Sequence, residues 1–484
     1  MKRIAFRFLA TASAAAGQAC LPVLLVVWHV LPVYPATRPH YGGTLRVEMR
    51  ARVASLDPRQ WPSDPGEAAG AERAAALVLE RLVRLDENGQ PQPSLAVAWQ
   101  HDAESKRWQF RLRTGVKFHD GTPLTPNQAA EALQALLGEA RRVSVSGEWL
   151  VIESPQPMPD LLGELARGRN FIFRAVPEGL VGTGPFRITE WQRQRRLVLA
   201  AHEDCWAGRP FVDGVTVEMG VAAPQQLIDL ELGKADLVEL SPQQVRRAAQ
   251  GGERSWSSAP VELLALAFDA HRPGVQDARM RQAVALAIDR ASIVNVLLQK
   301  QGAAAGSLLP QWLSGYAFLF PKAADTERAK QLRGELSAAA PLVLVYDSGD
   351  ASARAIAERV AVNARETGIT VQASDGGPAA AHADVRLVRL RLASTDARAA
   401  LDSLFAALGE PSALPAGAAT PEQLYAAERA LLASYRVVPL VHLPDIYGLG
   451  PRVKNWMPPR WGGWRLDDVW LDTASGAAGG EDKP

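Results

Sequence analysis

The chain has 484 residues and a mass of 52.1 kDa, with 47% hydrophobic and 22% charged residues. This composition excludes a disordered or fibrous chain, and the length suits about three domains of roughly 150 residues. Lys and Arg (53) balance Asp and Glu (52), so a net charge of +1 creates no global field for nucleic acid or an anionic membrane. Most basic residues are Arg, which fits either recognition of carboxylates and phosphates or a bias of composition.

Residues 1–41 have the order of an export signal. Lys2, Arg3 and Arg7 precede an apolar stretch over residues 8–34. This stretch is longer than a signal core of ~7–15 residues and reaches the ~20 residues that a spanning helix needs. We therefore expect a signal peptide or a membrane anchor, with the rest of the chain outside the cytoplasm. Cys20 is either an acylation site or a small apolar residue of an anchor.

Alternation and capping signals predict the first elements after this leader. Alternating residues predict a strand over 43–49 and a hairpin that joins 108–113 to 116–118. Helical spacing covers 71–83. A capping box formed by Thr125 and Gln128 precedes a helix over 129–137.

From residue 183 onward the pattern changes to alternating strands and helices. The predicted strands are 186–191, 196–200, 215–219, 235–238, 341–346, 368–371 and 439–443. The predicted helices are 225–232, 278–298, 351–366 and, after a capping box at Thr420, 424–432. The order strand, helix, strand over 341–371 predicts a parallel crossover in a Rossmann-like lobe. Residues 474–484 are Gly- and Ala-rich and are predicted to be a loose tail.

Motifs for catalysis and for cofactors are absent from the sequence. It has no phosphate-binding Gly-x-x-x-x-Gly-Lys-Ser/Thr loop, no Gly-x-Ser-x-Gly elbow and no His-Glu-x-x-His pair. The eight His are scattered singly, and Cys205 is the only cysteine besides Cys20, so no disulfide framework is expected within one chain. We therefore expect no enzyme, no cofactor and no built metal site.

Several segments in order along the chain resemble one family. They are Gly43–Arg46, Leu56–Pro58, Leu82–Val83, Leu95–Trp99, Trp108–Thr125, Gly182–Phe186, Phe268–Asp269 and Arg279–Arg290. The chain resembles the extracytoplasmic solute-binding proteins of peptide and nickel ABC importers, which are solute-binding protein family 5 of the dipeptide- and oligopeptide-binding type. The stretch Trp108–Thr125 is the most specific of these matches.

The resemblance implies an α/β fold, namely a two-lobed periplasmic-binding-protein fold of type II with an extra N-terminal α+β domain. The first lobe would comprise residues 42–56, 182–260 and 438–473. The extra domain would comprise 57–181, and the second lobe 261–437. Ligand would lie between two hinged lobes that close over it.

The resemblance also suggests candidate ligand-binding residues. Peptide-binding relatives hold the ligand's ammonium with an aspartate after a Trp-containing stretch, and Asp396 is the positional candidate here, although the Trp and Pro are missing. The alternative for Asp396 is a cap of a helix over 397–408. Trp312 and Tyr316 lie in an aromatic loop that either stacks on ligand or packs. Asp269 stands where the family usually shows Asn. The arginine for a ligand carboxylate would be Arg389, with Arg386 and Arg391 as alternatives.

The function implied is non-enzymatic capture of a peptide-like solute and its delivery to ABC permease subunits with a separate ATPase. The protein would be a monomer in the periplasm or on the outer face of the cytoplasmic membrane, held there through residues 1–41 if these are retained. One alternative is an anchored relative that acts as a sensor or scaffold. Another is a metal or metallophore binder that uses His119, His202 or His271.

Overall fold

The computed structural model describes residues 39–86, 89–177, 179–316, 319–336, 340–412, 414–415, 419–461 and 463–472. The chain divides into residues 1–38 and residues 39–484, and only the second unit contains described residues. The predictions of a leader and of a loose tail over 474–484 therefore lie outside the described part. Within that part, no helix combines the length and the apolar character that crossing a membrane requires.

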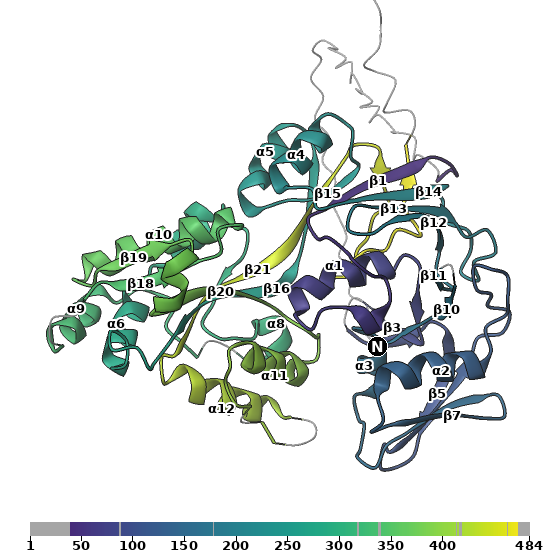
Figure 1. Cartoon of the computed structure of the whole chain (residues 1–484), viewed down its shortest axis with the longest axis horizontal. Coiled ribbons are helices and arrows are strands. Elements are labelled where there is room, and N and C mark those ends of the chain that lie inside the picture. The colour runs from purple at the N-terminus through teal and green to yellow at the C-terminus, as the bar shows by residue number, and fades with distance from the viewer. Residues whose placement is uncertain are drawn as a thin grey trace, which may run out of the picture. The chain divides into compact units, whose positions relative to one another are not determined.

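One mixed sheet runs through both lobes (Figure 1). In spatial order its strands are β12 (Phe186–Gln192), β13 (Arg196–Ala201), β14 (Gly214–Met219), β1 (Thr44–Met49), β15 (Leu237–Glu239), β21 (Val437–Leu449), β16 (Arg254–Phe268), β20 (Val385–Arg391), β18 (Leu342–Val345) and β19 (Val371–Ser374). A short strand, β17 (Ala303–Ala304), pairs with β21. The strands predicted over 186–191, 196–200, 215–219 and 341–346 are present, and β21 is longer than the predicted 439–443. The strands predicted over 235–238 and 368–371 begin later, at Leu237 and Val371.

Two long strands, β16 and β21, connect the lobes. Residues 254–257 of β16 pair with 446–449 of β21 on the first-lobe side, where β15 flanks β21. Residues 262–267 pair with 437–443, and there β20 flanks β16. Between these halves the register shifts, and Pro260 lies opposite Pro444. Because proline has no N–H to donate, the ladder is interrupted at this point, which is where the family resemblance implies a hinge.

The first lobe buries a core of Leu, Val and aromatic side chains from β1, β12, β13, β14 and the C-terminal segment. Its helices are η2 (Pro242–Gln244), α4 (Ala223–Glu231) and α5 (Val245–Gln250), and its C-terminal strands are β22 (Val453–Lys454) and β23 (Trp470–Leu471). The predicted helix 225–232 corresponds to α4. The helix ends where Gly233 adopts a positive φ of 65°, as the sequence indicated.

The second lobe confirms the predicted crossover. Strands β18 and β19 are parallel and are joined by α10 (Ala351–Glu366). The other helices are α6 (Ala278–Ala287), α7 (Arg290–Ser292), the π-helix η3 (Ile293–Leu297), α8 (Gln311–Ser314), α9 (Thr326–Gly334), the 3₁₀ turn η4 (Gly377–His382), α11 (Ala397–Ala407) and α12 (Pro421–Leu432). The capping box at Thr420 is formed as predicted.

The predicted continuous helix over 278–298 is wrong. Helix α6 ends at Ala287, where Ile288 leaves helical geometry with a ψ of 119°. Asp289 then caps α7 by accepting a hydrogen bond of 3.0 Å from the Ser292 amide. Asp289, in the middle of an apolar helical pattern, therefore marks the start of a second helix, because its carboxylate accepts a hydrogen bond from a backbone amide of the first turn.

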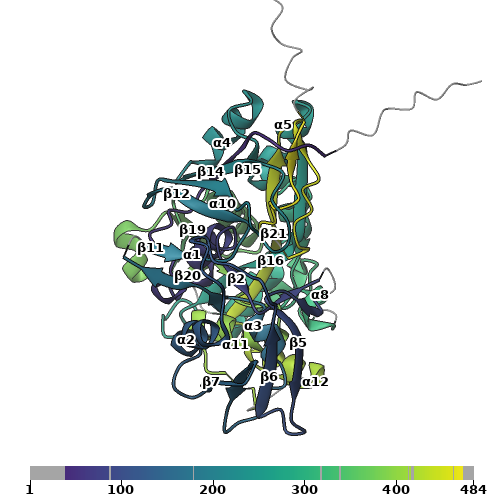
Figure 2. The same cartoon turned by 90° about the vertical axis from the view of Figure 1, so that its right-hand side faces the viewer.

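The extra domain contains two helices and several short sheets. Its strands are β2 (Glu80–Arg81), β3 (Val83–Leu85), β4 (Pro91–Pro93), β5 (Ala96–His101), β6 (Arg107–Leu112), β7 (Arg142–Ser146), β8 (Trp149–Glu153), β9 (Phe171–Ile172), β10 (Arg174–Val176) and β11 (Gly179–Val181). Its helices are α2 (Pro126–Leu137) and α3 (Leu161–Leu165). Helix α2 starts at the predicted capping box and lies beside the sheet β5–β6–β8–β7 (Figures 1 and 2).

The predicted hairpin of residues 108–113 with 116–118 is wrong. Strand β6 pairs with β5 on one side and β8 on the other. Residues 116–118 form no strand, and only an isolated bridge joins Lys117 to Pro123. One edge of β6 pairs with β5, the strand just before it in the sequence, and the other edge pairs with the distant strand β8, so no edge is left for residues 116–118.

The hydrophobic clusters divide the start of the chain differently from the predicted boundaries. Residues between Leu56 and Leu79 pack in the core of the first lobe, and the separate core of the extra domain begins at Leu82. The first of these segments holds the 3₁₀ turn η1 (Pro58–Gln60) and α1 (Pro65–Ala75), which starts at an Asp64 cap, so the helix predicted over 71–83 begins and ends earlier. The exact lobe boundaries stay a prediction.

Gly182 and Gly184, in one of the family-like segments, lie where two pieces of backbone meet. A Cβ on Gly182 would lie 2.0 Å from the Val78 carbonyl oxygen, and one on Gly184 would lie 2.7 Å from the same atom. The Gly184 amide donates a hydrogen bond of 3.0 Å to that oxygen. These glycines are therefore needed for close approach of the chain rather than for contact with a phosphate.

Candidate binding cleft

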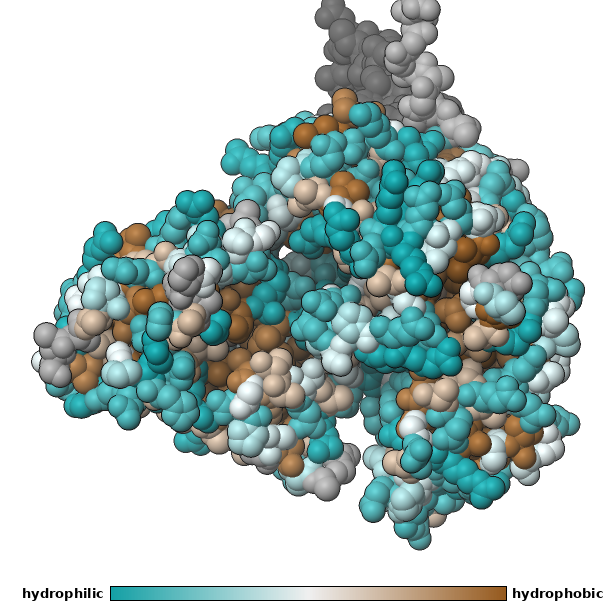
Figure 3. All heavy atoms as spheres, viewed as in Figure 1, coloured by the Kyte–Doolittle hydropathy of each residue, from teal (hydrophilic) through white to brown (hydrophobic). Residues whose placement is uncertain are grey.

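A cavity of about 470 Å³ is lined by residues of both lobes and of the extra domain. Its walls come from α1 and the strands that follow it, from residues 166–171, from the second-lobe residues Val261, Trp312 and 391–395, and from the segment 459–467. Figure 3 shows the molecule hollowed between the side that carries β18 and β19 and the side that carries β1 and β5. A cavity with walls on both sides of the β16–β21 hinge is the natural place for a ligand.

Aromatic side chains form much of the cavity wall. They are Trp61, Phe171, Trp206, Trp312, Trp461 and Trp464. The indole N–H of Trp312 donates a hydrogen bond of 2.8 Å to the carbonyl of Pro260, the proline of the hinge. Trp312 therefore connects the cavity wall to the strand that crosses between the lobes.

A group of buried charges lies at the base of the cavity, where the lobes meet. Asp445, beside the hinge proline of β21, accepts hydrogen bonds of 2.8 and 2.6 Å from Arg391 of β20. Arg73 of α1 lies 3.7 Å from Asp445 and 2.8 Å from Glu239 of β15. Burial alone would raise the pKa of Asp445, but the charge and hydrogen bonds of Arg391 lower it to about 2. The carboxylate is therefore ionised at neutral pH and joins the two lobes and α1.

The same group of charges continues along the second lobe. Glu262 of β16 contacts both Arg391 at 3.3 Å and Arg389 at 2.7 Å. Arg389 also pairs with Asp350, the N-cap of α10, at 2.5 Å. The charges of Glu262 and Asp350 raise the pKa of Arg389 against the opposing effect of burial. Each buried charge thus has a partner of opposite sign.

Glu80 lies on the opposite wall with neutral partners. Its carboxylate accepts hydrogen bonds from the Trp206 indole at 2.9 Å and from the Thr183 hydroxyl at 2.8 Å. Burial raises the pKa of Glu80 to about 7 against these hydrogen bonds. This wall therefore holds a carboxyl group that is partly protonated at neutral pH.

Asp396 caps a helix, which was the alternative to the ammonium role. Its carboxylate accepts a hydrogen bond of 2.7 Å from the Ala399 amide at the start of α11. The neighbouring Ser394 and Thr395 line the cavity, whereas Asp396 is not among the lining residues. A role for Asp396 in holding a ligand stays a prediction.

We expect the Asp396→Ala variant to lose about 1 kcal/mol of stability, because the amide of Ala399 loses its acceptor. The Asp396→Asn variant should keep most of that stability, since Asn caps helices about as well as Asp. Urea unfolding of both variants measures the effect. Equal destabilisation of the two would contradict the capping role and would show that the charge itself matters.

The two predicted aromatic residues have different surroundings. Trp312 lines the cavity. The hydroxyl of Tyr316 instead donates a hydrogen bond of 2.9 Å to the buried Glu428, and its ring packs edge-on against Tyr425. Tyr316 is thus engaged within the second lobe, while Trp312 stays a candidate for contact with ligand.

The remaining candidates lie outside the cavity wall. Asp269 is exposed in the turn after β16 and accepts a hydrogen bond from the His271 amide at 3.1 Å. Arg389 pairs with Glu262 and Asp350, and its neighbour Arg391 lines the cavity. Of the arginine alternatives, the structure therefore brings Arg391 to the cavity.

The histidines proposed for a metal do not form a ligand set. His119 and His202 stack edge to face at 4.9 Å, and both lie within hydrogen-bond distance of the Gly184 carbonyl. Burial lowers the pKa of His119 to about 4, so its ring is neutral. Among the described residues no group of three or more His, Cys, Asp and Glu is placed to hold a metal ion.

Sequence reasoning missed most of the charged wall of the cavity. Arg73 and Glu80 lie in the segment predicted as a helix, and Arg84 and Arg169 lie where no element was predicted. The available signal was the general excess of arginine, which does not indicate which arginines face a cavity.

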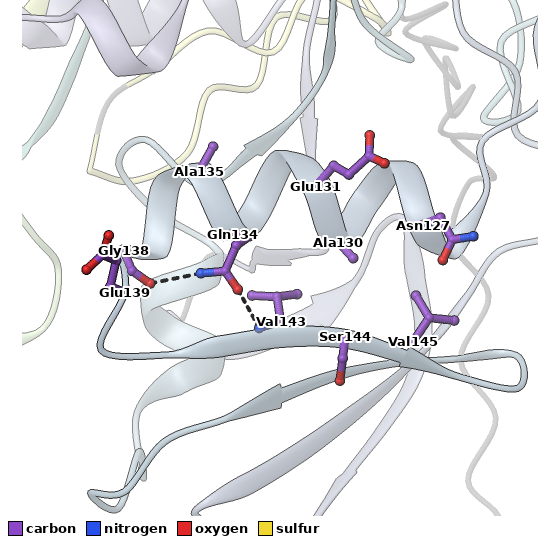
Figure 4. Close-up of a pocket in the computed structure, with 10 residues that line it drawn as sticks. All are labelled: Asn127, Ala130, Glu131, Gln134, Ala135, Gly138, Glu139, Val143, Ser144 and Val145. Atoms are coloured by element: carbon purple, nitrogen blue, oxygen red, sulfur yellow. Dashed lines mark hydrogen bonds between the residues drawn. The ribbon is translucent and has the colours of Figure 1, made fainter.

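A second hollow, of about 780 Å³, lies between α2 and β7 and is open to solvent (Figure 4). The side chain of Gln134 joins its two walls through hydrogen bonds to the Gly138 carbonyl at 3.0 Å and from the Val143 amide at 2.8 Å. All of its lining residues belong to the extra domain. Because no lobe closes over it, we regard the cleft between the lobes as the functional candidate.

Comparison with known proteins agrees with this architecture. The chain is 27% identical over 291 residues to the nickel-binding periplasmic protein of Escherichia coli (strain K12), an alignment that covers 54% of this chain and 55% of the relative. It is 26% identical over 344 residues to probable di/tripeptide-binding protein 5 of Pseudomonas aeruginosa (strain UCBPP-PA14), covering 61% and 64%. The chain thus spans between about half and two thirds of the length of these relatives.

The fold is shared with solved structures of binding proteins. The crystal structure of NikA from Staphylococcus aureus in complex with Ni(L-His)2 superposes with a TM-score of 0.73 at 16% identity, covering 89% of this chain and 100% of that one. The family model for bacterial extracellular solute-binding proteins, family 5, matches residues 90–414. This chain belongs to the bacterial extracellular solute-binding proteins of family 5.

Proposed function

We propose that this protein is the solute-binding component of an ABC importer, which captures a peptide-like solute outside the cytoplasm and delivers it to permease subunits served by a separate ATPase. Family membership supports a binding rather than a catalytic role. The observation that carries the proposal is a cavity with walls on both sides of a two-stranded hinge. Residues 1–41 would act as the export signal or as an anchor.

Closure of the lobes would couple binding to delivery. A ligand that contacts the second-lobe residues Trp312 and Ser394 as well as Arg81 of the extra domain stabilises only the arrangement in which these residues are close. The free energy of closure then comes from contacts that the open form lacks. The break opposite Pro260 and Pro444 gives the strands a place to bend.

We expect native mass spectra of protein purified from its own host to show a bound small peptide. We also expect di- and tripeptides to reduce the radius of gyration that small-angle scattering measures. The variant Trp312→Ala should weaken binding because it removes a cavity wall, whereas Trp149→Ala on β8, outside the cavity, should not. An unchanged envelope with every peptide would overturn the proposal. Closure only with nickel and histidine would favour the metallophore alternative, which the nickel-binding relative suggests.

A further inference from the structure

The charged side chains of the cavity wall are unequal in number. Seven arginines line it: Arg73, Arg81, Arg84, Arg167, Arg169, Arg391 and Arg465. Three acidic residues line it: Glu72, Glu80 and Asp467. Because guanidinium groups only donate hydrogen bonds, this wall offers many more donors than acceptors.

Five of these arginines are neutralised by carboxylates. Arg391 and Arg73 share Asp445, and each has a further acidic neighbour. The other three pairs are Arg81 with Glu72 at 2.6 Å, Arg167 with Asp160 at 2.8 Å and Arg465 with Asp467 at 3.7 Å. These charges are therefore balanced within the protein.

Arg169 is not balanced in this way. It donates hydrogen bonds to the backbone carbonyls of Pro58 at 3.0 Å, of Trp61 at 2.8 Å and of Pro62. These neutral acceptors fix the guanidinium in place, and no described carboxylate forms an ion pair with it. Since a guanidinium has five N–H groups, two remain for a ligand.

Arg84 is the second unbalanced cation. It follows Val83 on β3 with an exposed side chain, and this side chain makes no hydrogen bond or ion pair with any described residue. Two of the three lining carboxylates, Glu72 and Asp467, are already paired with other arginines. The third, Glu80, accepts hydrogen bonds from Trp206 and Thr183 at one oxygen and makes no ion pair with a described residue.

Neutral donors add to the same imbalance. The indole N–H groups of Trp61 and Trp464, two lining residues, have no hydrogen-bond partner in the described structure. Unpartnered buried donors cost free energy unless an acceptor reaches them. Acceptor groups supplied by a ligand would remove part of that cost.

We propose that the cleft selects acidic solutes, whose carboxylate groups pair with Arg84 and Arg169 on the extra-domain wall. This inference rests on the proposed binding function and specifies its substrate class. Charge-assisted bonds between guanidinium and carboxylate are directional and about twice as strong as neutral ones, so they provide selection between solutes of similar size. An acidic peptide and a non-peptide dicarboxylate share this chemistry.

Calorimetric titration of the full chain with Glu-Glu, Gln-Gln, Lys-Lys and glutarate tests the proposal. We expect Glu-Glu to bind at least tenfold more tightly than Gln-Gln, with an advantage that shrinks as salt is added. Equal or tighter binding of Gln-Gln or Lys-Lys overturns the acidic preference but leaves the binding function intact. Failure of all four to bind overturns both. If Glu-Glu binds and glutarate does not, the carboxylates belong to a peptide. If glutarate binds, a non-peptide acid is sufficient.

Variants separate the two arginines from general charge effects. Arg84→Gln changes an exposed side chain, so the variant should fold normally. Its ratio of affinities for Glu-Glu and Gln-Gln should fall by about tenfold. Arg169→Lys keeps a charge but loses the forked geometry, and it should lose part of the preference. Arg246→Gln on α5 is the control, because it removes an exposed arginine that does not line the cavity. A loss of preference in Arg246→Gln equal to that in Arg84→Gln contradicts the proposal.

Discussion

Replacing Asp445 by Ala is expected to lower the free energy of unfolding by about 3–5 kcal/mol, the usual cost of removing one partner from a buried ion pair. The side chain of Asp445 is only 11% exposed and accepts two hydrogen bonds from Arg391. Without this carboxylate, Arg391 retains only Glu262 at 3.3 Å, and Arg73 loses one of its two acidic neighbours. Urea unfolding followed by intrinsic fluorescence measures the loss.

The matched control for Asp445→Ala is Glu358→Ala, which breaks an exposed pair with Arg354 on α10. Because that pair is exposed to solvent, the Glu358→Ala variant should unfold at the same urea midpoint as the natural protein. An unchanged midpoint for Asp445→Ala as well would show that the charges at the hinge do not stabilise the fold.

The same carboxylate predicts a dependence on pH. Its folded pKa of about 2 lies below the ordinary value of 3.8, so its contribution is present above about pH 4 and is lost as the pH falls toward 2. The Asp445→Asn variant should therefore lose less stability than the natural protein over that interval.

Gly182→Ala is expected to cost about 3 kcal/mol or more, at or above the upper end of the range for overpacking a folded core. The added Cβ would lie 2.0 Å from the Val78 carbonyl oxygen and 2.9 Å from its carbon. Both atoms belong to the backbone, so no side-chain rotation relieves the overlap. The segment 182–186 would have to separate from residues 77–79, which pack in the core of the first lobe. Chemical denaturation measures the change.

Gly334→Ala is the matched control because it adds the same methyl group with the opposite expected sign. Among the described residues, no atom lies within 4 Å of the Cβ position of Gly334, which ends helix α9. Restricting the unfolded chain there should stabilise the protein by about 0.4–1 kcal/mol. If both variants destabilised the protein equally, close packing at Gly182 would not be the cause.

Elements with local signals were predictable from the sequence. Thr125 and Thr420 sit at capping boxes that the structure contains, and the crossover β18–α10–β19 follows its strand, helix, strand pattern. Elements that depend on distant neighbours were not. Strand β8, which pairs with β6, comes from residues 149–153. The cap at Asp289 is local, but it interrupts a pattern that otherwise reads as one long helix.

The cavity wall was largely beyond sequence reasoning for a geometric reason. Arg389 and Arg391 are two residues apart on β20 and point to the same face, so alternation cannot distinguish them. What separates them is the contact of Arg391 with Asp445, a residue 54 positions later. Arg84 and Arg169 likewise meet the cavity only because the extra domain packs beside the first lobe.

The position of β21 has a consequence for how the chain is made. This strand lies between β15 and β16, in the middle of the sheet, yet it comes from residues 437–449. A growing polypeptide therefore cannot complete either half of the sheet until almost all of it has been synthesised. Such distant pairing slows folding. We therefore expect the two lobes to acquire their final pairing together, at the end of synthesis.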